Sequence, residues 1–350
     1  MFRNFQMKRI ALSVVVIVAV VVVIAFAVIT TERGQNVLLK KGARAVNGVA
    51  PAFDDGLHVF VCGSAAPIPA PGRAQACIAV ITPDHFFVVD TGSGSVNNIG
   101  LERLPVDRLD GVLLNHFHSD HIVDLPTLNV ISWASGHDGP LRVYGPPGVE
   151  QVVTGFNQAM GLDRLYRTRH HGEDYLPAAS GVMLGTEHSP ASELVLGDLR
   201  ITSFAADHSP VEPAVSYRFD YKGRSIVITG DTVVTDDLRT QVATADLLLT
   251  DALSLPIVET LHEAVSAAGN RQLTKILEDI QGYHAPVSDI VELAHASDST
   301  MVALYHLVPG PRNIVMEQVF KRGFTDDMVL THDGMWFHLQ AGSNEIDIEH

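Results

Sequence analysis

The sequence predicts an α/β protein in which one domain of helix-covered sheets follows an N-terminal transmembrane helix. Short apolar runs that are rich in branched or aromatic residues and bounded by Gly, Pro or Asp are typical of strands. Longer segments with a helical spacing of apolar residues lie between these runs. Ahead of both, Ile10–Ile29 is a run of twenty residues without a charge. That length crosses the hydrocarbon of a bilayer as a helix.

We therefore divide the chain into an anchor at residues 1–30, a linker at 31–55 and one domain at 56–341. The predicted strands of the domain include LHVFVCG, CIAVI, FFVVD, GVLLN and LRVYG. The predicted helices are Ile122–Ser135, Gly148–Met160, Thr235–Ala245, Ser288–Ala296 and Pro311–Arg322. The span 161–192 contains several His, Gly and Pro residues, and we predict an irregular insertion there.

Basic residues on both sides of the apolar run bear on its orientation. Arg3, Lys8 and Arg9 precede it, which predicts that everything after Thr30 lies outside the cytoplasm, in the periplasm or the extracellular space. Four basic residues after the run weaken this prediction: Arg33, Lys40, Lys41 and Arg44. The alternative is a cleaved signal peptide and a secreted protein, because AFA at residues 25–27 resembles a cleavage box. The length of the run favours an uncleaved anchor.

The balance of charge bears on the partners. Lys and Arg number 24 against 40 Asp and Glu, which gives a formal net charge of −16. A surface that acidic repels phosphate backbones on average, so nucleic acid is an unexpected partner. The densest basic stretch, RLYRTRHH at Arg164–His171, is interpreted as a solvated face.

The two cysteines, Cys62 and Cys77, make neither a disulfide framework nor a CxxC zinc motif. A single disulfide between them would suit an oxidising compartment. The sequence does not reveal one, and we predict free, mostly buried thiols.

The stretch NHFHSDH at residues 115–121 places three histidines and an aspartate within seven positions. It follows the predicted strand GVLLN, and a strand end holds side chains stiffly around one point. His116 and His118 are two residues apart and can supply two nitrogens to one metal ion. Asp120 and His121 follow in the turn, where the carboxylate can bind a second ion or take a proton. The stretch could be a surface histidine run, a single structural metal site or half of a two-metal catalytic centre, and ligands from elsewhere in the chain must decide.

The motifs H-x-H-x-D-H, G-D-T and Y-H-L occur in this order, and the chain resembles the metallo-β-lactamase superfamily in its ribonuclease Z-like and arylsulfatase-like branch. The resemblance extends from about Leu57 to Leu339. It implies a four-layer αββα sandwich with a site for two metal ions at the rim where the sheets meet. It also implies a third histidine, a bridging aspartate and a final histidine, each at a later strand end.

Each of these three residues has a candidate. Two HSP triplets compete for the third histidine, at His188 and His208. His208 precedes a predicted hairpin whose second strand ends in G-D-T, so His208 and Asp231 can meet at one ion, whereas His188 lacks such a hairpin. His306 follows an apolar run and is the candidate for the final histidine. The implied sets are His116, His118 and His208 on one ion and Asp120, His121 and His306 on the other, with Asp231 between them.

Two further residues are expected to support the centre. Asp90 precedes the glycine-rich TGSGS, and we interpret it as a carboxylate that orients the histidine loop. His284 matches a ribonuclease Z-like position that polarises the scissile group or protonates its leaving oxygen. Catalysis is thus assigned to Asp120 and His284. Nitrogen and oxygen ligands fit zinc, which is the default, although manganese or iron would also accept them.

These expectations combine into a membrane-anchored hydrolase with two divalent metal ions and a metal-bound hydroxide that cleaves a small ester-like or phosphodiester-like substrate. Antibiotic hydrolysis is disfavoured, because Asp231 stands where penicillin-destroying relatives place a cysteine. Ribonuclease Z relatives often carry a His-Glu pair where this chain has Thr250 and Asp251, and a basic, Gly/Pro-rich arm for transfer RNA is not evident. The alternatives are a ribonuclease Z-type phosphodiesterase acting on RNA and a catalytically silent metal-binding scaffold.

Overall fold

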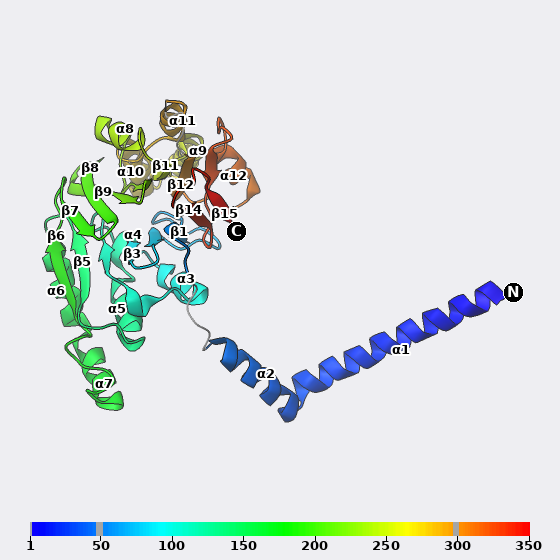
Figure 1. The fold of residues 1–350 in the computed structure, drawn as a ribbon. Coiled ribbons are helices and arrows are strands. Elements are labelled where there is room, and N and C mark those ends of the chain that lie inside the picture. The colour runs from blue at the N-terminus through cyan, green and yellow to red at the C-terminus, as the bar shows by residue number, and fades with distance from the viewer. Residues whose placement is uncertain (1, 47–51, 297–300) are drawn as a thin grey trace. The chain divides into compact units, whose positions relative to one another are not determined.

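The structure is a computed structural model that describes residues 2–46, 52–296 and 301–350 (Figure 1). The chain forms two compact units, Met1–Ala50 and Pro51–His350. These units are described separately below.

The first unit contains two helices, α1 (Phe2–Thr30) and α2 (Glu32–Val46). Within α1, the span Leu12–Thr30 is long and apolar enough to cross a membrane, although a signal sequence would meet the same criterion. Helix α2 occupies much of the segment that we predicted as a linker. Its sequence, ERGQNVLLKKGARAV, contains good helix formers and no proline.

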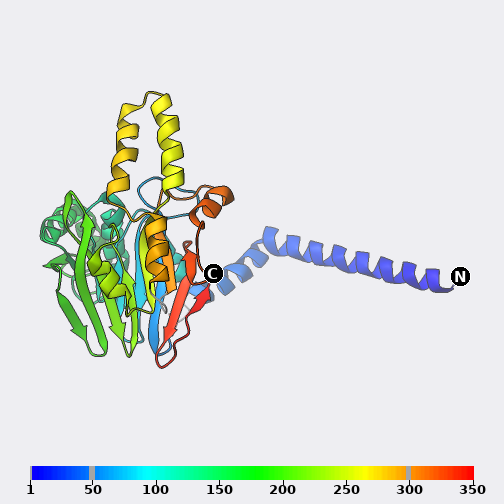
Figure 2. The same cartoon turned by 90° about the horizontal axis from the view of Figure 1, so that it is seen from above.

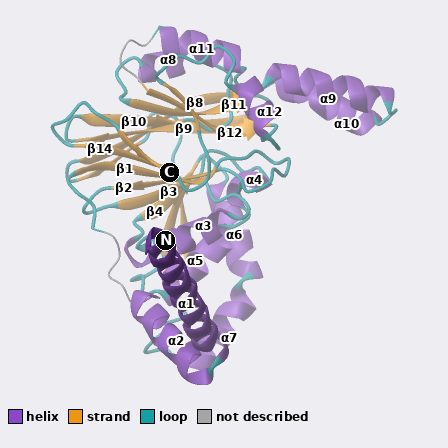
Figure 3. Ribbon diagram, turned by 90° about the vertical axis from the view of Figure 1, so that its right-hand side faces the viewer, coloured by secondary structure: helices purple, strands orange, loops and turns teal. Residues whose placement is uncertain are grey.

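The second unit contains two sheets with helices on their outer faces (Figure 3). Among the described residues, the strand order is β15-β14-β1-β2-β3-β4-β5-β6 in one sheet and β13-β12-β11-β10-β9-β8-β7 in the other. The strands are β1 (Gly56–Gly63), β2 (Cys77–Ile81), β3 (Phe86–Val89), β4 (Gly111–Leu113), β5 (Leu141–Gly145), β6 (Met183–Glu187), β7 (Glu193–Leu196), β8 (Leu199–His208), β9 (Val211–Tyr221), β10 (Arg224–Ile228), β11 (Leu247–Leu253), β12 (Met301–Val308), β13 (Met328–Leu330), β14 (Trp336–Gln340) and β15 (Asp347–Glu349). The helices are α3 (Ser95–Glu102), α4 (Ser119–Ile122), α5 (Leu125–Ala134), α6 (Val149–Ala159), α7 (Gly161–His171), α8 (Asp236–Val242), α9 (Leu255–Ala267), α10 (Arg271–Asp279), α11 (Val287–His295) and α12 (Ile314–Phe320).

Side chains alternate along the strands between the core that separates the two sheets and the cores under the outer helices. Val59 and Val61 of β1 enter the core between the sheets, whereas Phe60 enters the core under α3, α5 and α6. In the second sheet, Ile226 packs inward and Val227 packs outward with residues of α8, α11 and α12. Successive strand residues point to opposite faces, so strands that are apolar at every position are buried on both sides. The result is the predicted αββα sandwich, which is confirmed.

The irregular insertion predicted at 161–192 is wrong in part. Residues Gly161–His171 form helix α7, and Met183–Glu187 form β6, the edge strand of the first sheet. Helices α9 and α10 were not predicted from the sequence; they pack against each other and project from the sandwich as a hairpin (Figure 2). Helix α10 is rich in charged residues, which hides the short apolar stripe that a two-helix contact requires. Helix α9 contains only two charged residues, and its apolar spacing was a signal that could have been used.

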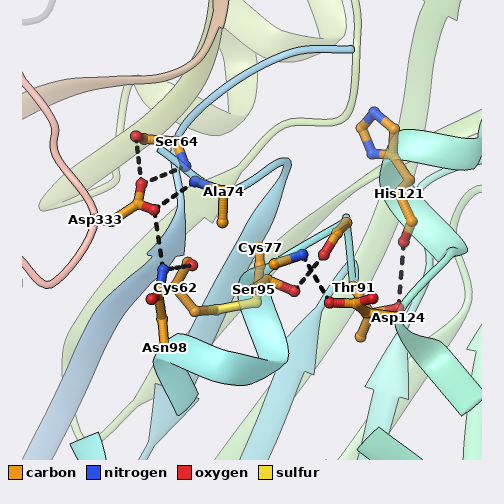
Figure 4. Close-up of a disulfide and its surroundings, with 12 residues drawn as sticks. Cys62, Ser64, Ala74, Cys77, Thr91, Ser95, Asn98, His121, Asp124 and Asp333 are labelled. Atoms are coloured by element: carbon orange, nitrogen blue, oxygen red, sulfur yellow. Dashed lines mark hydrogen bonds between the residues drawn. A yellow bond between two sulfur atoms is a disulfide. The ribbon is translucent and has the colours of Figure 1, made fainter. Parts of the chain in front are cut away.

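The prediction of free thiols is also wrong, because Cys62 and Cys77 form a disulfide (Figure 4). Cys62 lies near the end of β1 and Cys77 begins β2, and the two strands pair antiparallel. The pairing brings the two Cα atoms to 5.1 Å, within the range of a disulfide. Sequence separation alone does not give the register of two strands, and it was this register that decided the pairing.

Candidate metal centre

The seven predicted ligands lie in one cluster where strands of both sheets end. Four of them occupy the segment from the end of β4 through α4 in the first sheet's half of the domain. The other three come from β8, from the turn after β10 and from β12 in the second sheet. His118 is exposed, and the other six are buried: His116, Asp120, His121, His208, Asp231 and His306.

Asp90 holds the loop after β4. Its Oδ1 accepts a hydrogen bond from the backbone N–H of Asn115 at 2.9 Å, and its Oδ2 accepts one from Asn115 Nδ2 at 2.8 Å. Oδ2 also lies 2.8 Å from His121 Nδ1, so a proton on that nitrogen leaves Nε2 free to face the cluster. Asp90 adopts a φ of +58°, a left-handed conformation that is uncommon for a residue with a side chain. The carboxylate therefore contacts the histidine loop as an orienting group would.

A bulge turns His306 toward the centre. Thr250 of β11 pairs with Leu304 of β12, but Ala252 pairs with Leu307, so β12 contains one extra residue between these pairs. Such bulges re-aim side chains near functional sites. His306 lies within the bulge at a φ of +43°, which is strained for histidine.

The first group of ligands, called here the His116 set, consists of His116, His118 and His208. Nε2 of His116 and Nε2 of His208 lie 3.0 and 3.3 Å from Nδ1 of His118. Oδ2 of Asp231 is 3.8 Å from Nε2 of His116 and 3.7 Å from Nε2 of His208. Atoms bound to one zinc ion at about 2.0–2.1 Å lie roughly 3–3.5 Å from one another. The spacing of these four residues thus suits a single ion.

The second group, called here the Asp120 set, consists of Asp120, His121 and His306. Oδ2 of Asp120 lies 3.6 Å from His121 Nε2 and 3.1 Å from His306 Nε2. Oδ1 of Asp231 lies 3.4 Å from His121 Nε2 and 3.3 Å from His306 Nδ1. The two carboxylate oxygens of Asp231 consequently face different sets, Oδ2 the His116 set and Oδ1 the Asp120 set.

Several buried polar atoms of the cluster lack a hydrogen-bond partner. His116 Nδ1 is one, and three others face one another: His121 Nε2, His306 Nδ1 and Asp231 Oδ1. A buried polar atom without a partner is costly, and three that converge on one point would be satisfied together by a cation. The donor atoms are nitrogen and oxygen, which zinc, manganese and iron accept. The residues therefore fit a pair of divalent metal ions.

The electrostatics of the cluster also favour cations. Burial lowers the pKa of His116 well below its usual value and that of His208 to about 4, so both rings are neutral at pH 7 and offer lone pairs. Burial disfavours charge on His121 as well, but Asp231, Asp90 and Asp120 outweigh it and raise the pKa of His121. Carboxylates that stabilise a proton at this point would stabilise a metal ion in its place.

His284 lies beside the cluster and is held by Asp251. The Nδ1 of His284 is 2.9 Å from Asp251 Oδ2 and 4.0 Å from Asp231 Oδ2. Both side chains are buried, and burial lowers the pKa of His284. In the sequence, Asp251 stands out only as a departure from the His-Glu pair of ribonuclease Z relatives. Its location at the end of an apolar run, shared with Asp90 and Asp231, was a signal that could have found it.

His188, the rival third histidine, lies elsewhere. Its ring packs against Tyr144 with centroids 4.8 Å apart, and its backbone N–H donates to the carbonyl of Gly145 at 2.6 Å. Among the described residues, it belongs to none of the groups whose ligand atoms converge. Of the two histidines in HSP triplets, His208 is the one that lies in the cluster, with His116, His118 and Asp231.

A cavity of about 550 Å³ opens beside the His116 set. His118 and His208 form part of its wall, and Tyr283 lies with its ring edge-on to His208 at a centroid distance of 4.9 Å. The remaining lining residues are Ser209, Pro210, Val211, Asp279 and Gly282. The end of the α9–α10 hairpin thus forms one side of the entrance.

Comparison with known families identifies the chain's superfamily. A family described as the β-lactamase superfamily domain matches residues 85–307, which include the whole cluster. The chain belongs to the metallo-β-lactamase superfamily, in its ribonuclease Z-like branch. The resemblance seen in the motifs is confirmed.

Individual relatives support the same assignment. The chain is 30% identical to the ribonuclease Z of Mycobacterium bovis over 256 residues, which cover 72% of this chain and 86% of the relative. The metallo-β-lactamase fold protein YhfI from Bacillus subtilis superposes with a TM-score of 0.59 at 20% identity, over 81% of this chain and all of that one. The short form of human tRNase Z superposes with a TM-score of 0.55 at 20% identity, over 80% and 98%. These two structures establish the fold.

Proposed function

We propose that the protein is a hydrolase with two divalent metal ions that cleaves a small ester-like or phosphodiester-like substrate. The observation that carries the proposal is the position of Asp231, whose two oxygens face the His116 set and the Asp120 set separately. A carboxylate in that position can bridge two ions, with His116, His118 and His208 on one and Asp120, His121 and His306 on the other. Zinc is the metal that we favour for this set of nitrogen and oxygen donors.

When bound, the two ions would supply an activated water and electrostatic stabilisation of the oxyanion that develops in hydrolysis. The protein's own groups would then manage the protons. Nδ1 of His284 lies 2.9 Å from Asp251 Oδ2. When both ring nitrogens carry a proton, Nδ1–H donates to Asp251 and Nε2–H can donate to a leaving oxygen or polarise the scissile group, with the neutral ring left behind. Asp120, close to both His121 and His306, would hold its ion and remain available to take a proton.

The entrance favours a small substrate over RNA. The cavity beside His118 holds about 550 Å³, and its described lining contains Asp279 but no Lys or Arg. A site that grips a nucleic-acid backbone needs basic residues around it. The kinship with ribonuclease Z nevertheless makes RNA the second candidate substrate, since enzymes of that name process RNA.

A substrate panel would test the proposal. The full-length protein in detergent, loaded with zinc, would be assayed against nitrophenyl phosphodiesters, sulfates, lactones and thioesters, and against a precursor tRNA with a 3′ extension. We expect turnover of one small-ester class and weak, salt-sensitive action on RNA. Efficient RNA cleavage with slow turnover of every small ester would favour the ribonuclease reading. Two bound ions without any turnover would favour the silent scaffold.

We further propose that α1 remains uncleaved and anchors the domain outside the cytoplasm. The support is its length, its lack of charge from Ile10 to Ile29 and the basic residues before it. The protein should then resist extraction by carbonate while its domain is cut by protease added from outside. A soluble mature form that begins near Val28 would contradict the anchor, and protection from external protease would contradict the orientation.

A further inference from the structure

Helix α2 is amphipathic, and the large apolar side chains that the structure describes in it are exposed. Leu38 and Leu39 lie on one side of the helix and are 48% and 69% exposed. Arg33 and Lys40 are seven residues apart and share the opposite side. Lys41 borders this side, and the exposed Val37, four residues from both Arg33 and Lys41, is the one large apolar residue described there. A helix with an apolar face and a basic face suits the boundary between headgroups and acyl chains of a membrane.

The geometry points to α2 as an interfacial helix that lies on an anionic phospholipid surface where α1 leaves the membrane. This inference rests on α1 being a membrane anchor, which is part of the proposed function. It assigns a partner to a segment whose sequence first suggested only a linker. The occupant of the apolar face is the lipid bilayer itself.

The turn between α1 and α2 suits a change of direction at a membrane surface. At the end of α1, side chains in the turn satisfy backbone carbonyls: Thr30 Oγ1 donates to Phe26 O, and Gln35 Nε2 donates to Ile29 O at 2.9 Å. Thr31 caps α2, because its Oγ1 accepts from the backbone N–H of Gly34 at 3.2 Å. An unpaired carbonyl is expensive in lipid, so these contacts let the apolar helix end near the hydrocarbon.

Gly34 makes this turn sharp. A Cβ at this position would lie 2.3 Å from the carbonyl oxygen of Val28 and 2.4 Å from its Cα. These are backbone atoms and would have to move to accept any larger residue. The turn between α1 and α2 therefore depends on a glycine, as expected for a fixed change of direction rather than a continuous helix.

Charge is segregated between the two units of the chain. Residues 1–46 contain seven of the 24 Lys and Arg residues but one of the 40 Asp and Glu residues, which leaves +6 on this segment and −22 on the remainder. Anionic lipids attract basic segments beside a membrane span and repel an acidic domain. The surface that fits anionic headgroups is therefore α2 rather than the catalytic domain.

Depth measurements on the full-length protein test this inference. Cys62 and Cys77 form a disulfide, so a spin label would react only with an introduced cysteine. Labels at Leu39→Cys, Asn36→Cys and Val18→Cys would be compared in vesicles of phosphatidylcholine alone and with added phosphatidylglycerol. We expect the Leu39 label to be shielded from a water-soluble nickel reagent and exposed to oxygen when the anionic lipid is present. The Asn36 label, on the polar side, should stay accessible to nickel.

Charge reversal provides the matched variants. Replacing Arg33, Lys40 and Lys41 by Glu should lower the ratio of docked to undocked α2 by about a hundredfold or more, at roughly fivefold per basic residue near the surface. Replacing Arg167 and Arg169 of the exposed helix α7 by Glu, which also removes basic charge, should leave the Leu39 label shielded. Gly34→Leu should reduce shielding without changing the charge.

The Val18 label in α1 distinguishes failure of the membrane anchor from failure of α2 to dock on the lipid surface. A Val18 label that is accessible to nickel would show that the anchor itself is wrong. A deep Val18 label with a Leu39 label that is equally accessible in both lipid mixtures would overturn the docking of α2 alone. Shielding of Leu39 in detergent without anionic lipid, increasing with protein concentration, would instead indicate a second copy of the chain and would also overturn the inference.

Discussion

Two groups of histidines in the same domain have different surroundings. His58 of β1 has a partner on each ring nitrogen: Nδ1 lies 2.8 Å from His338 Nδ1, and Nε2 lies 2.9 Å from the carbonyl oxygen of Asp54. His338 in turn stacks on Trp336, with the rings 13° from parallel. In the metal centre, by contrast, buried atoms such as His121 Nε2 and Asp231 Oδ1 have no hydrogen-bond partner.

The comparison shows which features mark a metal site. Proximity of two imidazoles is common to both places, so it does not decide the function. The centre differs because its free nitrogen and oxygen atoms converge, and because three carboxylates surround His121. A pair of histidines whose nitrogens are used by neighbours is satisfied within the fold, whereas a convergent set of unused atoms offers ligands to a cation.

The largest expected effect is the loss of activity on removing metal. A chelator should abolish turnover, by more than the roughly 10³-fold that one oxyanion donor contributes, because both activation of water and charge stabilisation disappear. Zinc added back should restore the rate, measured with the preferred small ester. His338→Gln should bind the same two ions and respond in the same way. If the unaltered protein bound a third ion and His338→Gln lost it, the His58 pair would also be a metal site, and the distinction between the two histidine groups would fail.

The next largest effect separates proton transfer from metal binding. His284→Ala should keep both ions but lower kcat by roughly 10²-fold or more. The loss should shrink for nitrophenolate leaving groups, which need no proton, and grow for alkoxides. Steady-state rates across a series of leaving groups would measure it. Equal losses for all leaving groups, or a depleted metal content, would leave His284 as a supporting residue.

Asp251 gives a matched variant for this comparison. Asp251→Asn keeps the shape but weakens the hold on His284 Nδ1. Its rate should fall in the same leaving-group-dependent pattern as that of His284→Ala, and the double variant should be little worse than His284→Ala alone. Additive losses in the double variant would show that the two residues act separately.

A smaller effect is expected at Asp90. Asp90→Asn should weaken zinc binding by roughly 10–100-fold, the usual scale for a residue that orients a ligand. The reason is the 2.8 Å contact with His121 Nδ1, which an amide supports less well than a carboxylate. Competition with a chelator of known affinity would measure the change. Unaltered affinity would mean that the loop holds His121 without Asp90.

The smallest effect concerns the His58 pair and the stability of the domain. Burial lowers the pKa of His58, so its neutral form is favoured in the folded state. This contribution is present above the unfolded pKa of about 6.5 and is lost as the pH falls below it. His58→Gln should flatten the decrease in unfolding free energy between about pH 7 and 5, measured by urea denaturation of the zinc-loaded protein. An unchanged slope would show that His58 does not contribute to it.

Much of this could be predicted from the sequence because the ligands follow apolar runs. His116, Asp231 and His306 each lie at or near the end of a buried strand, and β strands in one sandwich share a rim. The hairpin after His208 decided between two identical HSP triplets, since β9 and β10 place Asp231 near the end of β8. The fold class followed from the same strands.

What escaped prediction depends on register and on long-range contact. The disulfide depends on the pairing of β1 with β2. The direction of the His306 side chain depends on an extra residue in β12 opposite Asp251. Helix α10 has a narrow apolar stripe among charged residues, and the role of the α9–α10 hairpin at the entrance depends on where Tyr283 returns to the sandwich. None of these follows from local spacing.

The central claim is that Asp231 bridges two metal ions, and the metal content of two variants tests it most directly. Elemental analysis of the purified, folded protein should find two zinc ions per chain in the unaltered protein and in His188→Ala, because His188 packs on Tyr144 away from the centre. Asp231→Ala should fall below one ion per chain and lose turnover. Two ions retained in Asp231→Ala, or a deficit in His188→Ala, would contradict the account.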